Sequence, residues 1–338
     1  MATINDVIPP FQLYQPTTLD DAAELAREHG EDAWIMAGGM DSFDWLKDRT
    51  KRTEAVIDLS LVEEMRGIRE VSEGDGGLEI GAMTTLTDVA ESPLVRERFR
   101  VLADAAALVA SPQIRNQGTL GGNVSQDTRC AYYRRGWTCY RAGGNICYAD
   151  TPTAFNREHA ILDASRCVAV SPSDTAPALV ALDAQMVIRR GGGERVVDAD
   201  DYFLGPKVDI RHMTVLEPGD LLTAIRIPAT WAGARFYFEK VRDREVWDFP
   251  LVNVASAIRE NGGRITEARV VVGAVAARPL RLREVEESLA GQIMNDEAVV
   301  RAGEIAIRGA RELRFNAYKV PLMRNLVKRA VRGGPQSA

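Results

Sequence analysis

The sequence predicts an α+β protein built from more than one domain. Three features carry this prediction: the length of 338 residues, a β-α-β pattern within residues 1–60, and a hairpin followed by helices near the C-terminus. A chain of this length exceeds what one simple core accommodates, so two or three domains are expected.

The first 60 residues follow a pattern typical of a small β-α-β unit. TTLDDAAELAREHG (17–30) has threonines at its start, two acids in its first turn and Gly30 at its end, which predicts a capped helix. The apolar stretches AWIMAGG (33–39) and AVIDLS (55–60) predict short strands. The first of these strands runs directly into a glycine pair.

The middle of the chain alternates strands with helices. GGLEIGAMTTLTDVAES (76–92) predicts a strand and a short helix, and the helical spacing of apolar residues in 92–111 predicts one longer helix. SDTAPALVALDAQMVIRR (173–190) predicts a helix followed by a strand. Alternation and β-branched content predict further strands at 195–201, 221–228 and 234–242.

The C-terminal part indicates a separate α+β unit. Residues 252–279 predict two strands joined by a hairpin turn at Gly262 and Gly263. Three helices are expected after them, at 282–291, 295–310 and 318–331. Strands followed by helices predict a sheet with helices on one face.

Composition narrows the function classes. Hydrophobic residues make up 46% of the chain and charged residues 27%, which is ordinary for a globular protein. The net charge of −6 argues against general nucleic-acid binding. No stretch has the length of a membrane span, and the N-terminus lacks the pattern of a signal peptide, so we expect a cytoplasmic location, with export alongside a signal-bearing partner left open.

Two glycine pairs suggest a phosphate site. MAGGMDS (36–42) and GTLGGNVS (118–125) each bring a Gly-Gly pair to a predicted turn. Glycine lets backbone N–H groups approach a phosphate with no Cβ in the way. Neither segment matches the Rossmann or P-loop pattern, and a single such segment is most often an ordinary tight turn. Two of them, rich in small polar residues, favour a nucleotide cofactor.

All four cysteines fall in one window of the chain, with the spacing Cys130-x8-Cys139-x7-Cys147-x19-Cys167. A zinc site usually shows closely spaced cysteine pairs, which are missing here. Disulfides are disfavoured in a cytoplasmic chain, and four unrelated buried cysteines would rarely gather in one window. An iron–sulfur cluster held by all four is the favoured interpretation, and the other three stay open.

Local charge agrees with an anionic cluster. Residues 127–167 contain six arginines against four acids, a local excess of +2 in a chain of −6. Arginine N–H groups can also donate to sulfur and tune a cluster's potential. A solvated basic face explains the same arginines equally well.

Several segments together resemble a known family. AGGMDS, IGAMTTLTDV, IRNQGTLGGNVSQD and SPSDTAPALVALDA resemble, in order, the FAD-binding subunit of the molybdenum hydroxylases, the family of xanthine dehydrogenase, aldehyde oxidoreductase and CO dehydrogenase. VVVGAVAARPLRLREVE and NAYKVPLMRNLVKRAV resemble that family's C-terminal flavoprotein domain. The family usually has Thr, Gln or His where this chain has Met40.

The resemblance implies a fold and an FAD site. The fold is a two-part FAD-binding domain of the vanillyl-alcohol oxidase and p-cresol methylhydroxylase (PCMH) type, with parts at 1–60 and 61–230, followed by a CO-dehydrogenase-flavoprotein-like α+β domain at 231–338. Both glycine turns would cradle the FAD pyrophosphate, and the Ser173–Asp174 region would lie against the cofactor. The implied FAD-binding residues are Met36, Ala37, Gly38, Gly39, Met40, Asp41, Ser42, Ser111, Ile114, Gly118, Thr119, Gly121, Gly122, Asn123, Ser125, Ser173 and Asp174.

The resemblance also favours a second redox group. Most members run almost directly from the GGN segment to the Ser-Asp segment, whereas a smaller group carries an insertion that binds a [4Fe–4S] cluster. The 4-hydroxybenzoyl-CoA reductases and certain bacterial aldehyde oxidoreductases belong to that group. Residues 127–168 resemble the insertion, and Cys130, Cys139, Cys147 and Cys167 match its ligand positions. The long gap before Cys167 favours the aldehyde oxidoreductase form.

The expected function is electron transfer within a larger enzyme. By resemblance, the molybdenum cofactor and a [2Fe–2S] centre lie on a large and a small partner subunit, and this chain passes their electrons to an external acceptor. No residue of this chain is expected to act as a general acid or base on the organic substrate. Two alternatives stay open: a subunit of the 4-hydroxybenzoyl-CoA reductase type and a self-sufficient FAD oxidoreductase.

Overall fold

The N-terminal part forms a three-stranded parallel sheet. The computed structural model describes residues 8–71 and 76–334. The strand order is β1-β3-β2, from β1 (Gln12–Tyr14), β2 (Ala33–Met36) and β3 (Ala55–Asp58), with helices α1 (Leu19–His29) and α2 (Ser42–Lys47). The predicted helix cap is confirmed: Thr18 Oγ1 accepts from the Asp21 N–H at 3.1 Å, and Gly30 ends α1 with a φ of 50°.

The middle of the chain forms a five-stranded antiparallel sheet. Its order is β4-β5-β8-β6-β7, from β4 (Ile68–Val71), β5 (Gly77–Gly81), β6 (Gln185–Arg190), β7 (Gly193–Asp198) and β8 (Leu221–Pro228). β5 is buried along its whole length and pairs with β8, which follows more than 130 residues later. The chain between them carries the helices and the cysteine segment.

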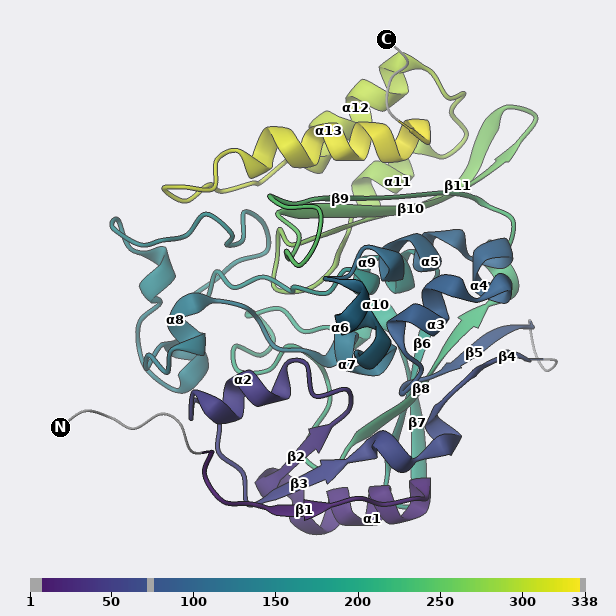
Figure 1. The fold of residues 1–338 in the computed structure, drawn as a ribbon. Helices are drawn as coiled ribbons and strands as arrows, with labels where there is room; N and C mark the ends of the chain where they lie inside the picture. Colours follow the sequence, from purple (N-terminus) through teal and green to yellow (C-terminus); the bar gives the residue numbers. More distant parts are fainter. Residues whose placement is uncertain (1–7, 72–75, 335–338) are drawn as a thin grey trace.

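Short helices pack beside this sheet (Figure 1). They are α3 (Leu86–Glu91), α4 (Pro93–Arg98), α5 (Arg100–Ala107), α6 (Pro112–Gln117), α7 (Leu120–Ser125), α9 (Thr175–Ala181) and α10 (Ala199–Tyr202). The prediction of one helix over 92–111 is wrong, because the chain breaks between α4 and α5. Phe99 leaves the helical region there, with φ −141° and ψ 51°, and its side chain is fully buried.

The cysteine segment has little regular structure. Its one α-helix is α8 (Ala131–Arg134), followed by single 3-10 turns at Tyr140–Ala142 and Tyr148–Asp150. Trp45, Tyr133 and Cys139 form a small buried cluster that fixes the segment against α2. The remaining 3-10 turns of the fold are Gly30–Asp32, Leu59–Leu61, Glu63–Met65 and Ala229–Trp231.

The C-terminal part is a four-stranded antiparallel sheet between two layers of helix (Figure 1). The strand order is β12-β11-β10-β9, from β9 (Arg235–Val241), β10 (Val252–Asn261), β11 (Arg264–Gly273) and β12 (Leu280–Arg281). One face carries α11 (Arg283–Leu289), α12 (Asp296–Ala306) and α13 (Lys319–Arg332), while α5 and α9 contact the sheet from the other side. Gly262 and Gly263 form the predicted hairpin turn with φ of 58° and 76°. The predicted α+β class is confirmed.

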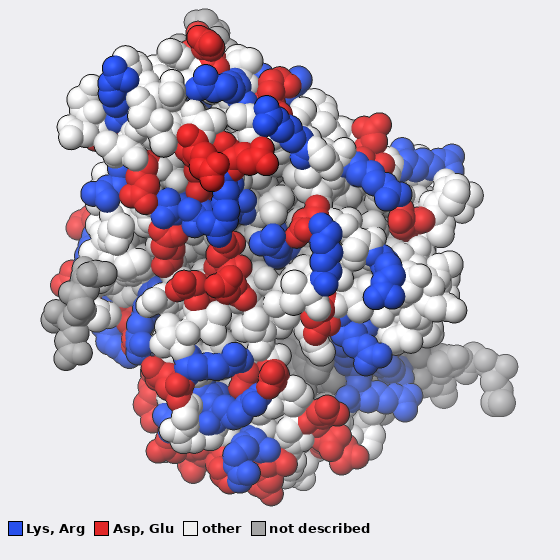
Figure 2. Space-filling model, turned by 180° about the vertical axis from the view of Figure 1, so that it is seen from behind, with Lys and Arg blue, Asp and Glu red and all other residues white. Residues whose placement is uncertain are grey.

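The surface mixes both signs of charge. On the face that Figure 2 shows, basic and acidic side chains are interspersed. Many charged side chains of the described residues pair, as Arg190 does with Glu217 at 2.9 Å and Arg332 with Asp296 at 2.6 Å. Exposed pairs of this kind contribute little to stability. Within residues 8–71 and 76–334, no helix is both long enough and apolar enough to cross a bilayer.

A buried lysine connects the C-terminal part to the cysteine segment. Lys319, at the start of α13, is fully buried, and its Nζ donates to the Glu158 carbonyl at 2.8 Å and to the Ala274 carbonyl at 2.7 Å. Burial lowers the pKa of Lys319 from its ordinary value of 10.5 to about 7.

This lowered pKa predicts a pH-dependent stability. Between pH 7 and 10.5 the unfolded chain keeps a proton on Lys319 that the folded chain has released. Stability should therefore rise with pH across that window, by up to about 1.4 kcal/mol per pH unit. Denaturant unfolding of wild type and Lys319→Met at several pH values measures it. The free energy of unfolding of wild type minus that of Lys319→Met should increase as pH rises from 7 to 10.5, and a difference that stays constant would contradict the assignment.

Candidate functional site

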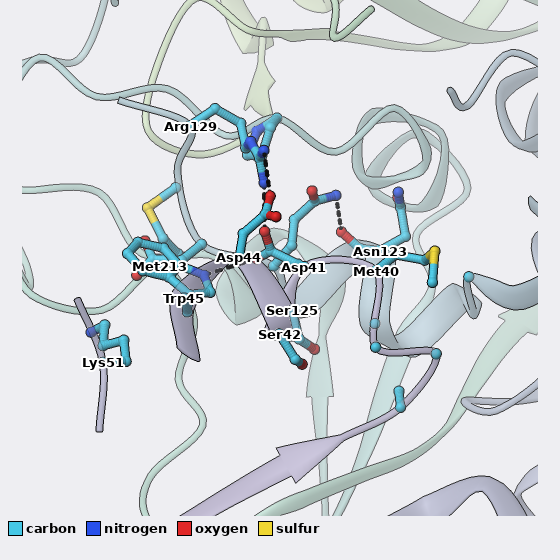
Figure 3. Close-up of a pocket in the computed structure, with 18 of the residues that line it drawn as sticks. Met40, Asp41, Ser42, Asp44, Trp45, Lys51, Asn123, Ser125, Arg129 and Met213 are labelled. Carbon is cyan, nitrogen blue, oxygen red and sulfur yellow. Dashed lines mark hydrogen bonds and ion pairs between the residues drawn. The ribbon is translucent and has the colours of Figure 1, made fainter. Parts of the chain in front are cut away.

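A cavity of about 1010 Å³ lies where the N-terminal sheet, the helices of the middle part and the cysteine segment meet. Figure 3 shows side chains from α2, α7 and the cysteine segment converging on it. Of the residues predicted to bind FAD, those that line it are Ala37, Gly38, Gly39, Met40, Asp41, Ser42, Ile114, Gly118, Thr119, Gly122, Asn123, Ser125 and Asp174. A cavity of this size and shape can take an extended ligand.

The first glycine segment offers a row of unused backbone donors. It connects β2 to α2, and Gly39 turns the chain with a φ of 75°. The backbone N–H groups of residues 38–42 donate to no residue that the structure describes. Successive free N–H groups along the wall of a cavity suit the oxygens of a phosphate. This observation agrees with the predicted pyrophosphate contact.

The two glycine segments lie against each other, although about 80 residues separate them in sequence. A Cβ on Gly38 would collide with the carbonyl oxygen of Gln117, at the end of α6. Only glycine at position 38 allows this approach. The contact brings Gly118 and Thr119 beside the free N–H groups of the first segment.

The second glycine segment differs from the predicted turn, because it forms the short helix α7. Thr119 Oγ1 caps this helix by accepting from the Gly122 N–H at 3.1 Å. The Gly121 N–H donates to the Ala82 carbonyl at 2.8 Å, and a Cβ at Gly121 would lie 2.7 Å from the Ala82 Cβ. Both glycine N–H groups therefore donate within the protein, Gly122 still lines the cavity, and a phosphate contact of this segment stays a prediction.

Four predicted residues do not line the cavity: Met36, Ser111, Gly121 and Ser173. Ser111 instead caps α6 by accepting from the Ile114 N–H at 3.4 Å. Ser173 donates to Asn123 Oδ1 at 2.7 Å and so connects the Ser-Asp segment to α7. These side chains support the residues that face the cavity.

Asp174 reaches the cavity as part of a buried ion pair. Its Oδ2 lies 2.6 Å from Lys240 Nζ on β9, and its Oδ1 accepts from Asn253 Nδ2 at 3.0 Å. The lysine side chain is fully buried and also donates to the Leu108 carbonyl at 3.0 Å. The pair therefore fixes the C-terminal sheet at the cavity edge.

Charged side chains of both signs line the cavity: Lys51, Arg129, Arg141 and Arg211, and Asp41, Asp44, Asp127, Asp174 and Asp248. Asp41 pairs with Arg129 at 2.6 Å and with Arg134 at 2.7 Å, and it accepts from Trp45 Nε1 at 3.1 Å. Lys51 forms no ion pair with any described residue, and its Nζ lies 5.6 Å from the centre of the Trp45 ring. Burial lowers the pKa of Lys51. Lys51 is therefore a basic residue of this cavity that no described carboxylate pairs with.

Several cavity residues could not be predicted from the sequence as ligand contacts. Lys51, Arg211, Met213, Trp247 and Phe249 line the cavity from segments without a glycine motif or a repeat. The positive φ of Trp247, 77°, is a feature of the folded chain that no residue pattern announces. Only the arginine excess of the cysteine segment pointed toward Arg129.

A second, smaller cavity brings the four cysteines together. Cys130, Cys139, Cys147 and Cys167 all line it, alongside Tyr132, Tyr133, Arg141, Tyr148, Ala149, His159 and Ala169. His159 Nε2 lies 3.3 Å from Cys130 Sγ. The cavity has a volume of about 10 Å³, so holding a cluster requires the thiols to rotate away from its centre. Residues far apart in sequence thus form one sulfur-lined site.

The four thiols form no disulfide, and Cys139 and Cys167 are buried while Cys130 and Cys147 are partly exposed. All four cysteines are free. Burial raises the pKa of Cys130 to about 11 and also raises that of Cys147. The thiols of Cys130 and Cys147 therefore stay protonated at neutral pH unless a metal replaces the proton. Among the described residues, no three His, Cys, Asp or Glu side chains are arranged to hold a single metal ion.

Comparison with known families identifies the class of protein. Residues 9–230 match the family described as "FAD binding domain in molybdopterin dehydrogenase", and residues 236–333 match "CO dehydrogenase flavoprotein C-terminal domain". The chain therefore belongs to the FAD-binding subunits of the molybdenum hydroxylase family, and it is a subunit of an oxidoreductase. The two-part FAD-binding fold with its flavoprotein C-terminal domain is confirmed.

Individual relatives agree with this membership. The carbon monoxide dehydrogenase medium chain of Hydrogenophaga pseudoflava is 31% identical over 331 residues, 96% of this chain and 97% of the relative. The aldehyde oxidoreductase FAD-binding subunit of Escherichia coli strain K12 is 34% identical over 281 residues, 82% of this chain and 85% of the relative. A solved carbon monoxide dehydrogenase structure from H. pseudoflava superposes with a TM-score of 0.77 at 30% identity, covering 97% of this chain and 98% of the matched one.

Proposed function

We propose that this chain is the electron-transfer subunit of a molybdenum hydroxylase and carries both FAD and a [4Fe–4S] cluster. One observation carries the proposal: all four cysteines surround one cavity, and that cavity adjoins the larger one. Bound FAD supplies two-electron chemistry, and a bound cluster passes one electron at a time. The chain's own residues bind and tune these groups.

The larger cavity fits FAD. The free N–H groups of residues 38–42 would hold the pyrophosphate, and Lys51 lines the same cavity. Thr119, the cap of α7, and Asn123, within α7, line the same cavity, as does Asp174. The glycine at 38 and the positive φ at Gly39 keep the phosphate-binding wall free of side chains.

The sulfur-lined cavity favours a cluster over the other interpretations of the cysteines. A single zinc ion draws four sulfurs to about 2.3 Å from one point, whereas a cluster has iron at four corners and keeps its thiolates farther apart. Four thiols around one cavity match the four cysteine ligands that a [4Fe–4S] cluster takes. Cys130, Cys139, Cys147 and Cys167 would be the ligands, of which Cys139 and Cys167 are buried.

We further propose that the holoenzyme oxidises aldehydes. The support is the 34% identity to the E. coli aldehyde oxidoreductase subunit, together with the cysteine segment that resembles the insertion of that subgroup. A carbon monoxide dehydrogenase is the second candidate, because the medium chain of that enzyme matches 96% of this chain. A 4-hydroxybenzoyl-CoA reductase would share the same cysteine segment.

Purification from the native host tests the subunit role. A tagged chain should bring with it a large molybdenum-cofactor subunit and a small [2Fe–2S] subunit, through an interface above about 1,000 Å². The complex should oxidise aldehydes and reduce an external acceptor. The pure single chain should bind FAD yet oxidise no aldehyde, purine or aromatic acid. Turnover of such a substrate by the single chain, free of partner proteins, would overturn the proposal in favour of a self-sufficient flavoenzyme.

A further inference from the structure

The two cavities share a wall. Tyr133, on α8, and Arg141, in the next turn of the segment, each line both the larger cavity and the sulfur-lined cavity. The Arg141 guanidinium carbon lies 5.7 Å from the centre of the Tyr133 ring. A charged side chain in this wall therefore exerts its electrostatic effect on ligands in both cavities.

Arg141 is a buried cation held in a fixed position. Its side chain is 1% exposed. Nη1 donates to the Arg211 carbonyl at 2.8 Å, and Nη2 donates to Met213 Sδ at 2.9 Å. Its Nε is buried and has no hydrogen-bond partner in the part of the chain that the structure describes. The guanidinium stays charged at any physiological pH, so this charge is permanent.

The charge of Arg141 is only partly balanced. Asp127 Oδ1 lies 3.3 Å from Nη1, and the Asp127 side chain is 23% exposed, so water screens it more than it screens the arginine. Lys51 adds a second positive charge near Asp127 and Arg141. The wall between the cavities therefore carries an excess of positive charge in a region of low dielectric constant.

We propose that the positive charge of Arg141 raises two reduction potentials at once: that of FAD in the larger cavity and that of the cluster in the sulfur-lined cavity. Each group becomes more negative when it takes up an electron, and a nearby fixed cation stabilises the more negative form. The proposal rests on the proposed function, because it requires FAD on one side of the wall and a cluster on the other. The chain would then raise both potentials through one side chain.

Potentiometric titration of the full chain tests the proposal. The cluster is followed by electron paramagnetic resonance and the flavin by visible absorbance, in wild type, Arg141→Gln, Arg141→Lys and Arg135→Gln. At a fixed applied potential, Arg141→Gln should lower the ratio of reduced to oxidised cluster at least tenfold, which is 59 mV for a one-electron couple. The flavin should shift in the same direction. Arg141→Lys should keep most of both potentials, and the exposed Arg135 serves as the matched control that changes neither.

Asp127→Asn provides the opposite test if Arg141→Gln folds poorly. Removing the partly exposed counter-ion leaves the arginine unbalanced, so both potentials should rise. Wild type without iron would refute the proposed cluster itself. A different result would overturn only the inference about Arg141. In that result, wild type and both variants carry FAD and iron in full, yet the potential of either group is unchanged in Arg141→Gln and in Asp127→Asn. The inference about Arg141 would also be overturned if Arg135→Gln, at an exposed position, shifted the potentials as much as Arg141→Gln.

Discussion

Replacing Gly39 with valine should leave the chain with little bound FAD. Gly39 has a φ of 75°, which strains any residue with a Cβ, and its Cβ would lie 3.0 Å from the Phe43 ring. The strain and the bulk fall within residues 38–42, whose free N–H groups are the proposed pyrophosphate donors. We expect FAD binding to weaken by about 2 kcal/mol or more, roughly 30-fold.

Gly67→Val is the matched control for this variant. Gly67 also has a positive φ, 91°, but a Cβ there meets nothing within 4 Å, and the residue does not line the cavity. Flavin absorbance per chain and the dissociation constant for FAD should change in Gly39→Val and stay near wild type in Gly67→Val. A full complement of flavin in Gly39→Val, or an equal loss in both variants, would show that the first glycine segment does not hold the phosphate.

Serine at any one of the four cysteines should remove most of the iron. Cys167 is the most informative position, because the longest gap in sequence precedes it and yet it lines the same cavity as the other three. A hydroxyl is a poorer iron ligand than a thiolate, so Cys167→Ser should fall from about four iron atoms per chain to below about one. Flavin should be largely retained, since Cys167 does not line the larger cavity.

Ser165→Ala, two residues away, controls for local disturbance of the chain. Its hydroxyl donates to the Pro206 carbonyl at 3.2 Å, so the variant also loses one contact of the segment without touching sulfur. Iron should stay near the wild-type level in this variant. Iron that survives in Cys167→Ser, or zinc bound in place of iron in wild type, would exclude the four-cysteine cluster.

Sequence patterns identified the regular elements well where local signals and tertiary packing agree. α1 has its cap, its acidic first turn and its terminal glycine, and the β10–β11 hairpin has its glycine pair. The prediction failed where tertiary packing decides. Burial of Phe99 splits one predicted helix into α4 and α5, a break that helical spacing does not reveal. β1 is three residues long and half exposed, so its pattern is too short to predict.

The candidate site, like the fold, could be predicted only in part, as the two glycine segments show. Their composition indicated a phosphate-binding surface, and the first segment has the free N–H groups that such a surface needs. Spacing does not tell which glycine faces a cavity and which allows close packing, and Gly121 turned out to pack on Ala82. The residues at 211–213 and 247–249 reach the cavity only through the folded arrangement of distant segments.

The cofactor content of the full chain, purified without oxygen, tests the central claim most directly. Flavin, iron, acid-labile sulfide and zinc are measured on one sample, together with its visible spectrum and the paramagnetic signal after reduction. The account predicts about one FAD and about four iron atoms per chain, with a broad absorbance beside the flavin bands. Flavin without iron, or zinc and disulfides at the four cysteines, would contradict the claim that one chain holds two redox groups across a shared wall.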